Sequence, residues 1–189
     1  MDVEQFGDEV IAGRQVTGEE ALELYDQPLA QLCAKADEIR RHFCGNGFDL
    51  CTIINGKSGR CSENCRFCAQ SAHNHTGAQE YPLLGEEELA AGAKRNDEQG
   101  VLRYSIVTSG KRLSDEEVER MCGAVRRIRR ETGIAVCVSF GLLDEGQYRK
   151  LKEAGVSRVH NNLETSRRNF ANVCTTHTFE EKLAAIRAA

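Results

Sequence analysis

Three cysteines at C-x3-C-x2-C spacing, Cys61, Cys65 and Cys68, constrain this chain more than any other feature of its sequence. The spacing lets one short loop direct three thiolates at a single inorganic centre. Four-iron clusters ordinarily take four cysteines, so three leave one iron without a protein ligand. Phe67 lies directly before the last thiol and is positioned to shield such a cluster from water. The run therefore predicts an iron–sulfur centre with an open coordination site.

A zinc site is the main alternative for the same cysteines. Together with His73 or His75 they make a Cys3His set of the kind that holds zinc in a tetrahedron. A disulfide framework is disfavoured, because the chain has nine cysteines, an odd number, and its first residues do not read as a signal peptide. A non-catalytic zinc module thus stays open as an alternative function.

The composition narrows the class of partner. A chain of 189 residues is long enough for one domain with a proper core. The net charge of −4 argues against a general nucleic-acid binder, which needs a basic face. No apolar run reaches the length of a membrane span, and nine cysteines fit a reducing compartment. We expect a cytoplasmic protein with neither a nucleic-acid nor a membrane partner.

Residues 1–45 are expected to form an N-terminal helical segment. Thr17 is a good N-cap, with glutamates in the turn that follows it. Pro28 then opens a further helix, and Gly45 suits its C-terminal end. The apolar stripe expected on that helix consists of Leu29, Leu32, Cys33, Ala36, Ile39 and Phe43.

Residues 46–189 alternate between short apolar runs and helical patterns. Strands are expected at 50–55, 104–108, 134–140 and 156–163. Helices are expected at 86–99 and after the caps Ser114, Asp144 and Thr178, two of which begin capping boxes with Glu117 and Glu181. Such alternation implies parallel strands with right-handed crossovers, and no GxGxxG follows the first strand. We predict an α/β fold, a partial (β/α) TIM-type barrel preceded by the N-terminal helices.

The number of units suggests an incomplete barrel. Eight strand–helix units usually need about 250 residues, and about four are recognisable here. The chain also stops inside a helical pattern at 186–189 without a glycine cap. We therefore expect a barrel truncated at its C-terminus.

Polar side chains are expected on the inner faces of the later strands. His160, Asn162 and Glu164 share one face if the strand continues through them, and a bound ligand is the simplest partner for three buried polar groups. The alternative is a water-filled rim, or hydrogen bonding within a local turn at Asn161 and Asn162. Cys137 and Ser105 lie at comparable depths on neighbouring strands, although Cys137 alone also fits a small buried hydrophobe. The residues without partners in the pattern, which we interpret as structural, are Cys122, Cys174 and His177.

Two longer stretches carry a family resemblance. Residues 54–77 (INGKSGRCSENCRFCAQSAHNHTG), and residues 160–166 (HNNLETS) followed by 175–178 (TTHT), resemble the biotin synthase family of radical S-adenosylmethionine enzymes. The similarity runs from about residue 22 to the end and covers a little over half of a usual family member. The cysteine run alone is specific only to the superfamily.

The resemblance implies a function and its cofactors. Cys61, Cys65 and Cys68 would hold a 4Fe–4S cluster whose open iron binds S-adenosylmethionine. An electron from a flavodoxin or ferredoxin would free a 5′-deoxyadenosyl radical, which takes hydrogen from dethiobiotin. Sulfur from an auxiliary cluster would then close the ring of biotin, which makes the enzyme a sulfurtransferase. Another radical enzyme of the hydrogenase-maturation type is the alternative, and a homodimer stays open as an assembly.

The resemblance also implies roles for single residues. Cys137 matches a ligand of the auxiliary cluster, a 2Fe–2S cluster or a variant of it. Asn162 matches a contact to substrate and S-adenosylmethionine, with His160 and Glu164 at neighbouring contact positions. Lys57 matches a basic residue near the substrate.

One position departs from the family pattern. Ser105 stands where the auxiliary cluster has a cysteine, and a serine oxygen is a harder and poorer ligand for iron than a thiolate. The other ligands of that cluster would lie beyond residue 189. We therefore expect this chain alone to be inactive in biotin formation.

Overall fold

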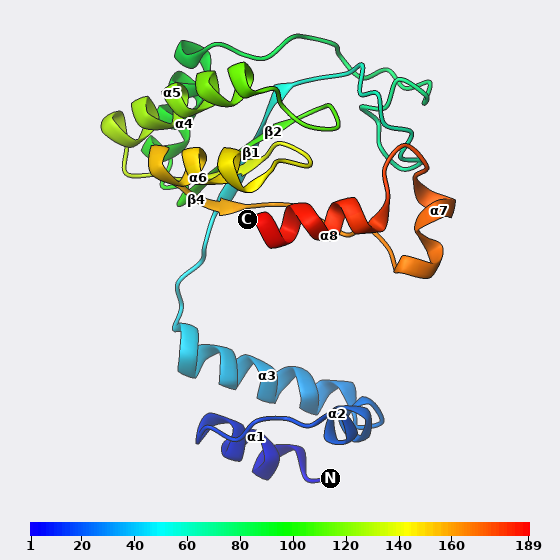
Figure 1. Ribbon diagram of the computed structural model, residues 1–189. Coiled ribbons are helices and arrows are strands. Elements are labelled where there is room, and N and C mark those ends of the chain that lie inside the picture. The colour runs from blue at the N-terminus through cyan, green and yellow to red at the C-terminus, as the bar shows by residue number, and fades with distance from the viewer. The chain divides into compact units, whose positions relative to one another are not determined.

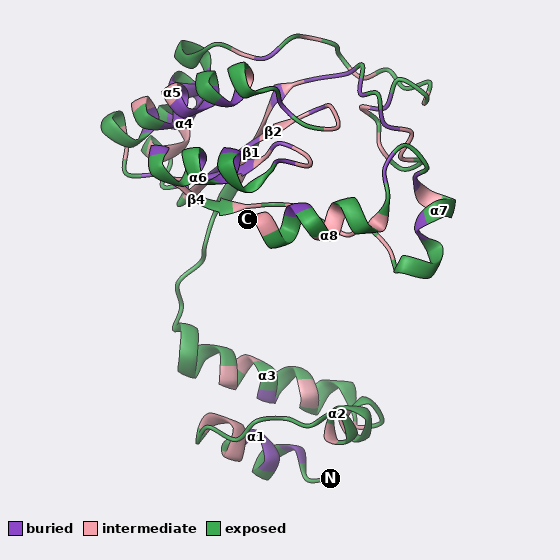
Figure 2. Ribbon diagram, viewed as in Figure 1, coloured by how far each residue is buried: buried purple, intermediate pink, exposed green.

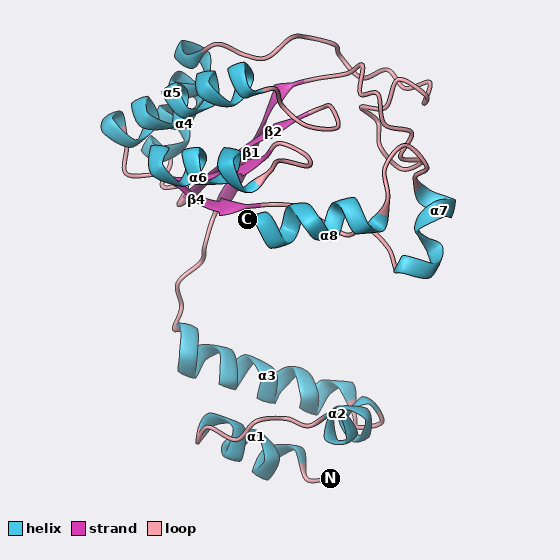
Figure 3. Ribbon diagram, viewed as in Figure 1, coloured by secondary structure: helices cyan, strands magenta, loops and turns pink.

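The computed structural model describes all of residues 1–189, which form two compact units, Met1–Phe48 and Asp49–Ala189 (Figure 1). The first unit is helical, and the second combines a parallel sheet with helices (Figure 3). None of the helices has both the length and the apolar character that crossing a bilayer requires.

The first unit consists of the helices α1 (Val3–Ile11), α2 (Gly18–Tyr25) and α3 (Leu29–Cys44). Thr17 and Glu20 form a capping box at the start of α2, so the predicted cap is confirmed. Helices α1 and α3 pack together, and a Cβ added to Gly7 would collide with the side chain of Lys35. Glycine at position 7 thus permits the close approach of the two helices.

The stripe predicted on α3 is only partly covered. Leu29 is 74% exposed and Phe43 61% exposed, so the two ends of the stripe are not buried. The position that is buried belongs to Lys35, whose ammonium pairs with Glu4, Asp8 and Glu38. A lysine stem can cover apolar surface while its charged end is neutralised, which a pattern of apolar residues does not register.

The second unit contains a four-stranded parallel sheet in the order β1-β2-β3-β4. Its strands are β1 (Cys51–Lys57), β2 (Arg103–Thr108), β3 (Ala135–Ser139) and β4 (Val156–Val159). The crossover helices are α4 (Glu86–Glu98), α5 (Asp115–Glu131) and α6 (Glu145–Ala154), and α8 (Phe179–Ala188) follows β4. Sequential parallel strands joined by helices are the arrangement of a (β/α) barrel, so the predicted partial barrel is confirmed.

The helices α4, α5 and α6 cover one face of this sheet. Tyr104 and Ile106 on β2, and Val136 and Val138 on β3, belong to the buried core shared with these helices. Figure 2 shows buried residues along the strands and on parts of the covering helices. Because side chains alternate along a strand, the residues between them point to the opposite face. That face is the one that lines the interior of a (β/α) barrel.

Capping boxes fix where the helices begin. Ser114 with Glu117 starts α5, and Thr178 with Glu181 starts α8, as predicted. Asp144 with Gln147 does the same for α6, which ends at Gly155 with a φ of 110°. These reciprocal hydrogen bonds satisfy backbone N–H groups next to the loops that leave the strands.

The chain after β4 differs from the prediction. The strand ends at Val159 rather than continuing to residue 163, and Glu164 has a left-handed φ of 66°. The strict alternation expected for residues 160–164 therefore does not apply. Two short elements that the sequence did not reveal follow, the 3-10 turn η1 (Arg167–Asn169) and α7 (Phe170–Val173). Segments of three or four residues are too short to show a period.

Candidate functional site

The cysteine loop leaves the carboxyl end of β1 and is held by a dense set of hydrogen bonds. The amide of Asn74 donates to the carbonyl oxygens of Cys65 and Cys68, at 3.0 and 2.9 Å. Cys61 exchanges backbone hydrogen bonds with the returning segment, accepting from Ala72 at 2.9 Å. These hydrogen bonds define the shape of the loop.

The three thiols of the loop meet at one cavity. Cys61, Cys65 and Cys68 line a space of about 210 Å³ at the carboxyl ends of the strands. In (β/α) barrels this end of the sheet is where active sites lie. Other side chains around the same cavity are Asn55, Phe67, Val107, Ser139, Glu164, Cys174, His177 and Lys182.

A distant segment completes the wall of this cavity. Asn64, between the first two loop cysteines, accepts a hydrogen bond from the backbone N–H of Thr175 at 2.9 Å. Its own N–H donates to the hydroxyl of Thr176 at 3.1 Å. The turn between α7 and α8 is thereby fixed against the cysteine loop, although the two lie more than a hundred residues apart in the sequence.

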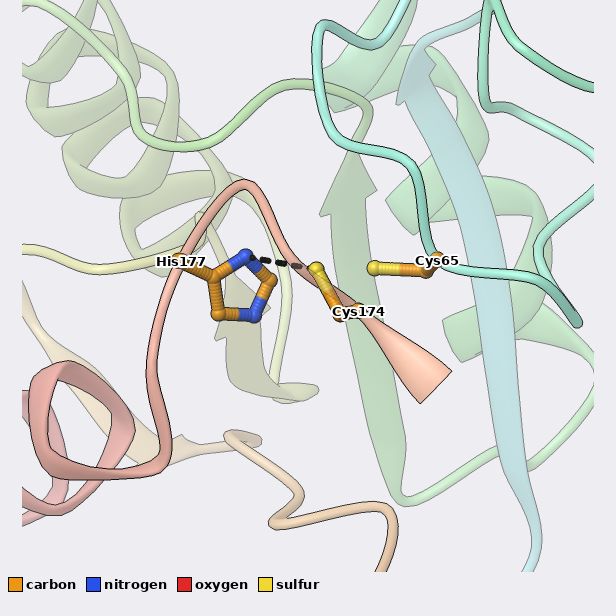
Figure 4. Close-up of side chains that lie close together, drawn as sticks. All are labelled: Cys65, Cys174 and His177. Carbon is orange, nitrogen blue, oxygen red and sulfur yellow. Dashed lines mark hydrogen bonds between the residues drawn. The ribbon is translucent and has the colours of Figure 1, made fainter. Parts of the chain in front are cut away.

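This docking brings Cys174 and His177 beside Cys65 (Figure 4). The sulfur of Cys174 lies 3.3 Å from Nδ1 of His177, and that nitrogen lies 2.5 Å from a carboxylate oxygen of Glu63. Thr176 donates its hydroxyl to the same oxygen at 2.8 Å. Cys174, His177 and Glu63 are all buried, so the group is shielded from solvent.

The two neighbouring thiols differ in acidity. Burial raises the pKa of Cys65 to about 12, and its hydrogen bond with Cys174 and the charges of Cys174, Cys68 and Cys61 add to the shift. Burial also acts against ionisation of Cys174, but hydrogen bonds from Thr176 and from the backbone of His177 leave the pKa of that thiol below its usual value. Cys174 is therefore the more acidic of the two thiols.

The residues fit a multi-iron cluster better than the zinc site considered as an alternative. The ligand atoms of Cys61, Cys65 and Cys68 do not converge with a histidine within 4.8 Å, whereas those of Cys65, Cys174 and His177 do. His73 instead lies 3.2 Å from the carbonyl oxygen of Ser62 and is not part of the cavity wall. Three thiols around one cavity, too widely spaced for one ion, suit a cluster of several irons.

Only one of the other predicted ligand-binding residues lines the cavity of the cysteine loop. Glu164 lines the cavity, but His160 and Asn162 do not. Lys57 lines a neighbouring cavity, and its ammonium forms an ion pair with Glu117 at 2.6 Å. Burial opposes ionisation of Glu117, but the hydrogen bond from Lys57 and a backbone hydrogen bond from Ser114 keep the pKa of that carboxyl below its ordinary value.

Ser105 and Cys137 are direct neighbours across the sheet. They are paired in the register of β2 and β3, and both are buried. Cys137 is outside the core that the helices share with the sheet, on the face opposite to Val136 and Val138. The two side chains do not line the cavity of the cysteine loop, so they occupy a separate, deeper position on the inner face.

Cys174 and His177 have partners in the structure, although the sequence pattern shows none for them. The structure brings both to the cysteine loop, and Glu63 inside that loop contacts His177. No local pattern could have revealed this group, because Glu63 and His177 lie more than a hundred residues apart in the sequence.

Comparisons with known proteins identify a matching superfamily and similar sequences. Residues 57–189 match the sequence model of the Radical SAM superfamily. A biotin synthase of Akkermansia muciniphila is 60% identical over 178 residues, covering 94% of this chain and 56% of that protein. A biotin synthase of Brachyspira hyodysenteriae is 49% identical and covers 100% of this chain and 57% of that protein. The chain thus spans a little over half the length of these relatives.

Solved structures share the fold. A methylornithine synthase (PylB) superimposes with a TM-score of 0.77 at 24% identity, covering 97% of this chain and 55% of that one. The FeFe-hydrogenase maturase HydG of Carboxydothermus hydrogenoformans gives a TM-score of 0.75 at 19% identity, covering 100% and 45%. At these identities the likeness concerns the arrangement of strands and helices alone.

Proposed function

This chain belongs to the Radical SAM superfamily, and from that premise we propose that it acts in a biotin synthase, which inserts sulfur into dethiobiotin to form biotin. The observation that carries the proposal is the cavity at the carboxyl ends of the strands, with Cys61, Cys65 and Cys68 in its wall. The identity of 60% with a biotin synthase supports the choice of reaction within the superfamily.

The three loop cysteines are the proposed ligands of a 4Fe–4S cluster. When bound, such a cluster would supply the electron for reductive cleavage of S-adenosylmethionine. The hydrogen bonds from Asn74 to the backbone of Cys65 and Cys68 hold the loop in the shape that presents its thiols to the cavity. Unactivated C–H bonds are beyond acid–base side chains, so the cofactor carries the hard step and the protein positions and shields it.

The cavity wall offers both polar and apolar groups to a bound ligand. Asn55, Ser139 and Glu164 provide hydrogen-bonding groups. Phe67 and Val107 provide apolar surface that excludes water from a reactive site. We assign Glu164 to binding of S-adenosylmethionine or dethiobiotin, and assign further contacts to Asn162, His160 and Lys57, as the family resemblance implies.

The deeper pair on the inner face is the proposed position of an auxiliary cluster. The thiol of Cys137 is a suitable iron ligand, and the hydroxyl of Ser105 beside it is a poor one. Two such side chains cannot complete a cluster, so it requires other ligands. A flavodoxin or ferredoxin as electron donor, a homodimeric assembly and a cytoplasmic location complete the proposal.

The proposal is tested by disrupting the coding region in the native organism. Loss of a biotin synthase produces cells that require biotin and that dethiobiotin does not rescue. Growth restored by dethiobiotin would place the block earlier and contradict the proposed reaction. The full-length gene carrying Cys65→Ala must fail to restore growth when it is re-expressed. The unaltered full-length gene must restore growth.

A further inference from the structure

Cys174 and His177 have no part in the proposed three-cysteine cluster, yet they lie beside one of its ligands. The ligand atoms of Cys65, Cys174 and His177 all lie within 4.8 Å of one another. We propose that in the cluster-free protein these three residues bind a single divalent ion, Zn²⁺ or Fe²⁺, and that this ion competes with the cluster for Cys65. The inference concerns the cluster-free form and does not depend on the identity of the substrate.

The spacing suits one ion. Zinc–sulfur bonds of about 2.3 Å in a tetrahedron put neighbouring ligand atoms roughly 4 Å apart. One ligand atom from each of Cys65, Cys174 and His177 lies within 4.8 Å of the other two, close to that separation. Two thiolates and an imidazole form a ligand set that zinc and ferrous iron favour.

The surroundings hold the imidazole in place. The carboxylate of Glu63 holds Nδ1 of His177 at 2.5 Å and receives the hydroxyl of Thr176 at 2.8 Å, which leaves Nε2 as the ring nitrogen that binds the ion. Metal-binding histidines commonly have a carboxylate partner that fixes the ring and raises its basicity. Cys174 is 3% exposed and His177 is 7% exposed, so their orientation is set by packing rather than by solvent.

Shared use of Cys65 makes the two bound states exclusive. When the thiolate of Cys65 binds the single ion, it is not available as a cluster ligand. Cys61 and Cys68 then remain, and two thiolates are too few to hold a four-iron cluster. Binding involves no redox change, since the ion displaces the proton of each thiol into solvent. Zinc is thus expected to delay cluster assembly, and removal of Cys174 is expected to relieve that delay.

The first experiment titrates the cluster-free, 189-residue chain with Co²⁺ under anaerobic conditions. We expect one equivalent to bind with thiolate-to-cobalt absorption, and Zn²⁺ to displace it. Cys174→Ala should weaken binding by at least about 100-fold, and Glu63→Gln by about 10- to 100-fold, the usual effect of losing a carboxylate partner. Cys68→Ala, which removes a proposed cluster ligand outside the group, should bind Co²⁺ as the unaltered chain does.

The outcomes separate this site from the cysteine loop. Unchanged Co²⁺ affinity in Cys174→Ala, or an equal loss in Cys68→Ala, would place the ion on the loop thiols and refute the proposal. His177→Gln provides a second variant, and far-ultraviolet circular dichroism verifies that each variant is folded.

A second readout follows cluster assembly itself. With iron, sulfide and one equivalent of Zn²⁺, the unaltered chain should assemble its cluster more slowly than Cys174→Ala, as measured by visible absorbance and acid-labile sulfide. Without zinc the difference between the two should shrink, because Fe²⁺ binds such a site more weakly than Zn²⁺. Equal inhibition by zinc would refute the competition for Cys65, whereas a lack of any cluster in either chain would refute the proposed three-cysteine cluster instead.

Discussion

Replacing Asn74 with alanine will weaken retention of the cluster without unfolding the protein. The side-chain amide of Asn74 makes two hydrogen bonds, to the carbonyl oxygens of Cys65 and Cys68 at 3.0 and 2.9 Å. A hydrogen bond of this kind contributes about 0.5–1.5 kcal/mol net, so losing both should destabilise the cluster-binding conformation of the loop by roughly 1–3 kcal/mol. Because each 1.4 kcal/mol is a factor of ten, cluster affinity should fall about 5- to 150-fold.

The assay is loss of iron to a chelator from the anaerobically reconstituted chain, followed by the decay of visible absorbance. Asn46→Ala, an exposed asparagine in the other unit, is the matched control and should leave the rate unchanged. Urea unfolding of the cluster-free chain verifies that the fold persists. An Asn74→Ala variant that holds iron as long as the control would refute the claim that this side chain shapes the loop.

Two further predictions concern the sheet and its charges. Leu89→Ala, at a side chain that is 0% exposed in the core of α4, should lower the free energy of unfolding by about 2–5 kcal/mol in urea titrations. Leu102→Ala, at a side chain 48% exposed, should change it by less than about 0.5 kcal/mol. The pKa of Glu117 lies below its ordinary value of 4.5, held there by Lys57 and Ser114 against the effect of burial. The contribution of Glu117 to the free energy of unfolding is therefore complete above pH 4.5 and is lost as the pH falls through the lower, folded-state pKa. Glu117→Gln should make the free energy of unfolding less dependent on pH in this acidic range. An unaltered acid limb in Glu117→Gln would show that the ion pair with Lys57 does not stabilise the fold.

Local chemistry explains the parts of the fold that the sequence predicted. The capping boxes at Ser114 and Thr178 are formed by residues three positions apart, so they are visible in a short stretch of sequence. The alternation of β-branched runs with helical periods likewise located β2 and β3 to within a residue or two. Once several such units follow one another, parallel strands and a barrel-type order are a consequence of how crossovers connect.

Long-range contacts explain what the sequence did not predict. The sulfur of Cys174 reaches Asn64 across 110 residues, and no periodic pattern links positions so far apart. Lys35 occupies a buried position on α3 because acidic groups on α1 neutralise it, which depends on tertiary packing. The strand β4 ends at Val159, and the Asn161-Asn162 pair that follows is unfavourable in a strand, so the expected extension to residue 163 was too long.

The most direct test of the account is the reaction of the reconstituted chain with S-adenosylmethionine under a strong reductant. We predict that the unaltered chain binds about four irons and sulfides, that its reduced electron paramagnetic resonance spectrum changes when S-adenosylmethionine is added, and that 5′-deoxyadenosine is released. Cys61→Ala, Cys65→Ala and Cys68→Ala should each abolish all three signals. Reductive cleavage that survives in Cys65→Ala would contradict the claim that these thiols hold a cluster with one iron left open.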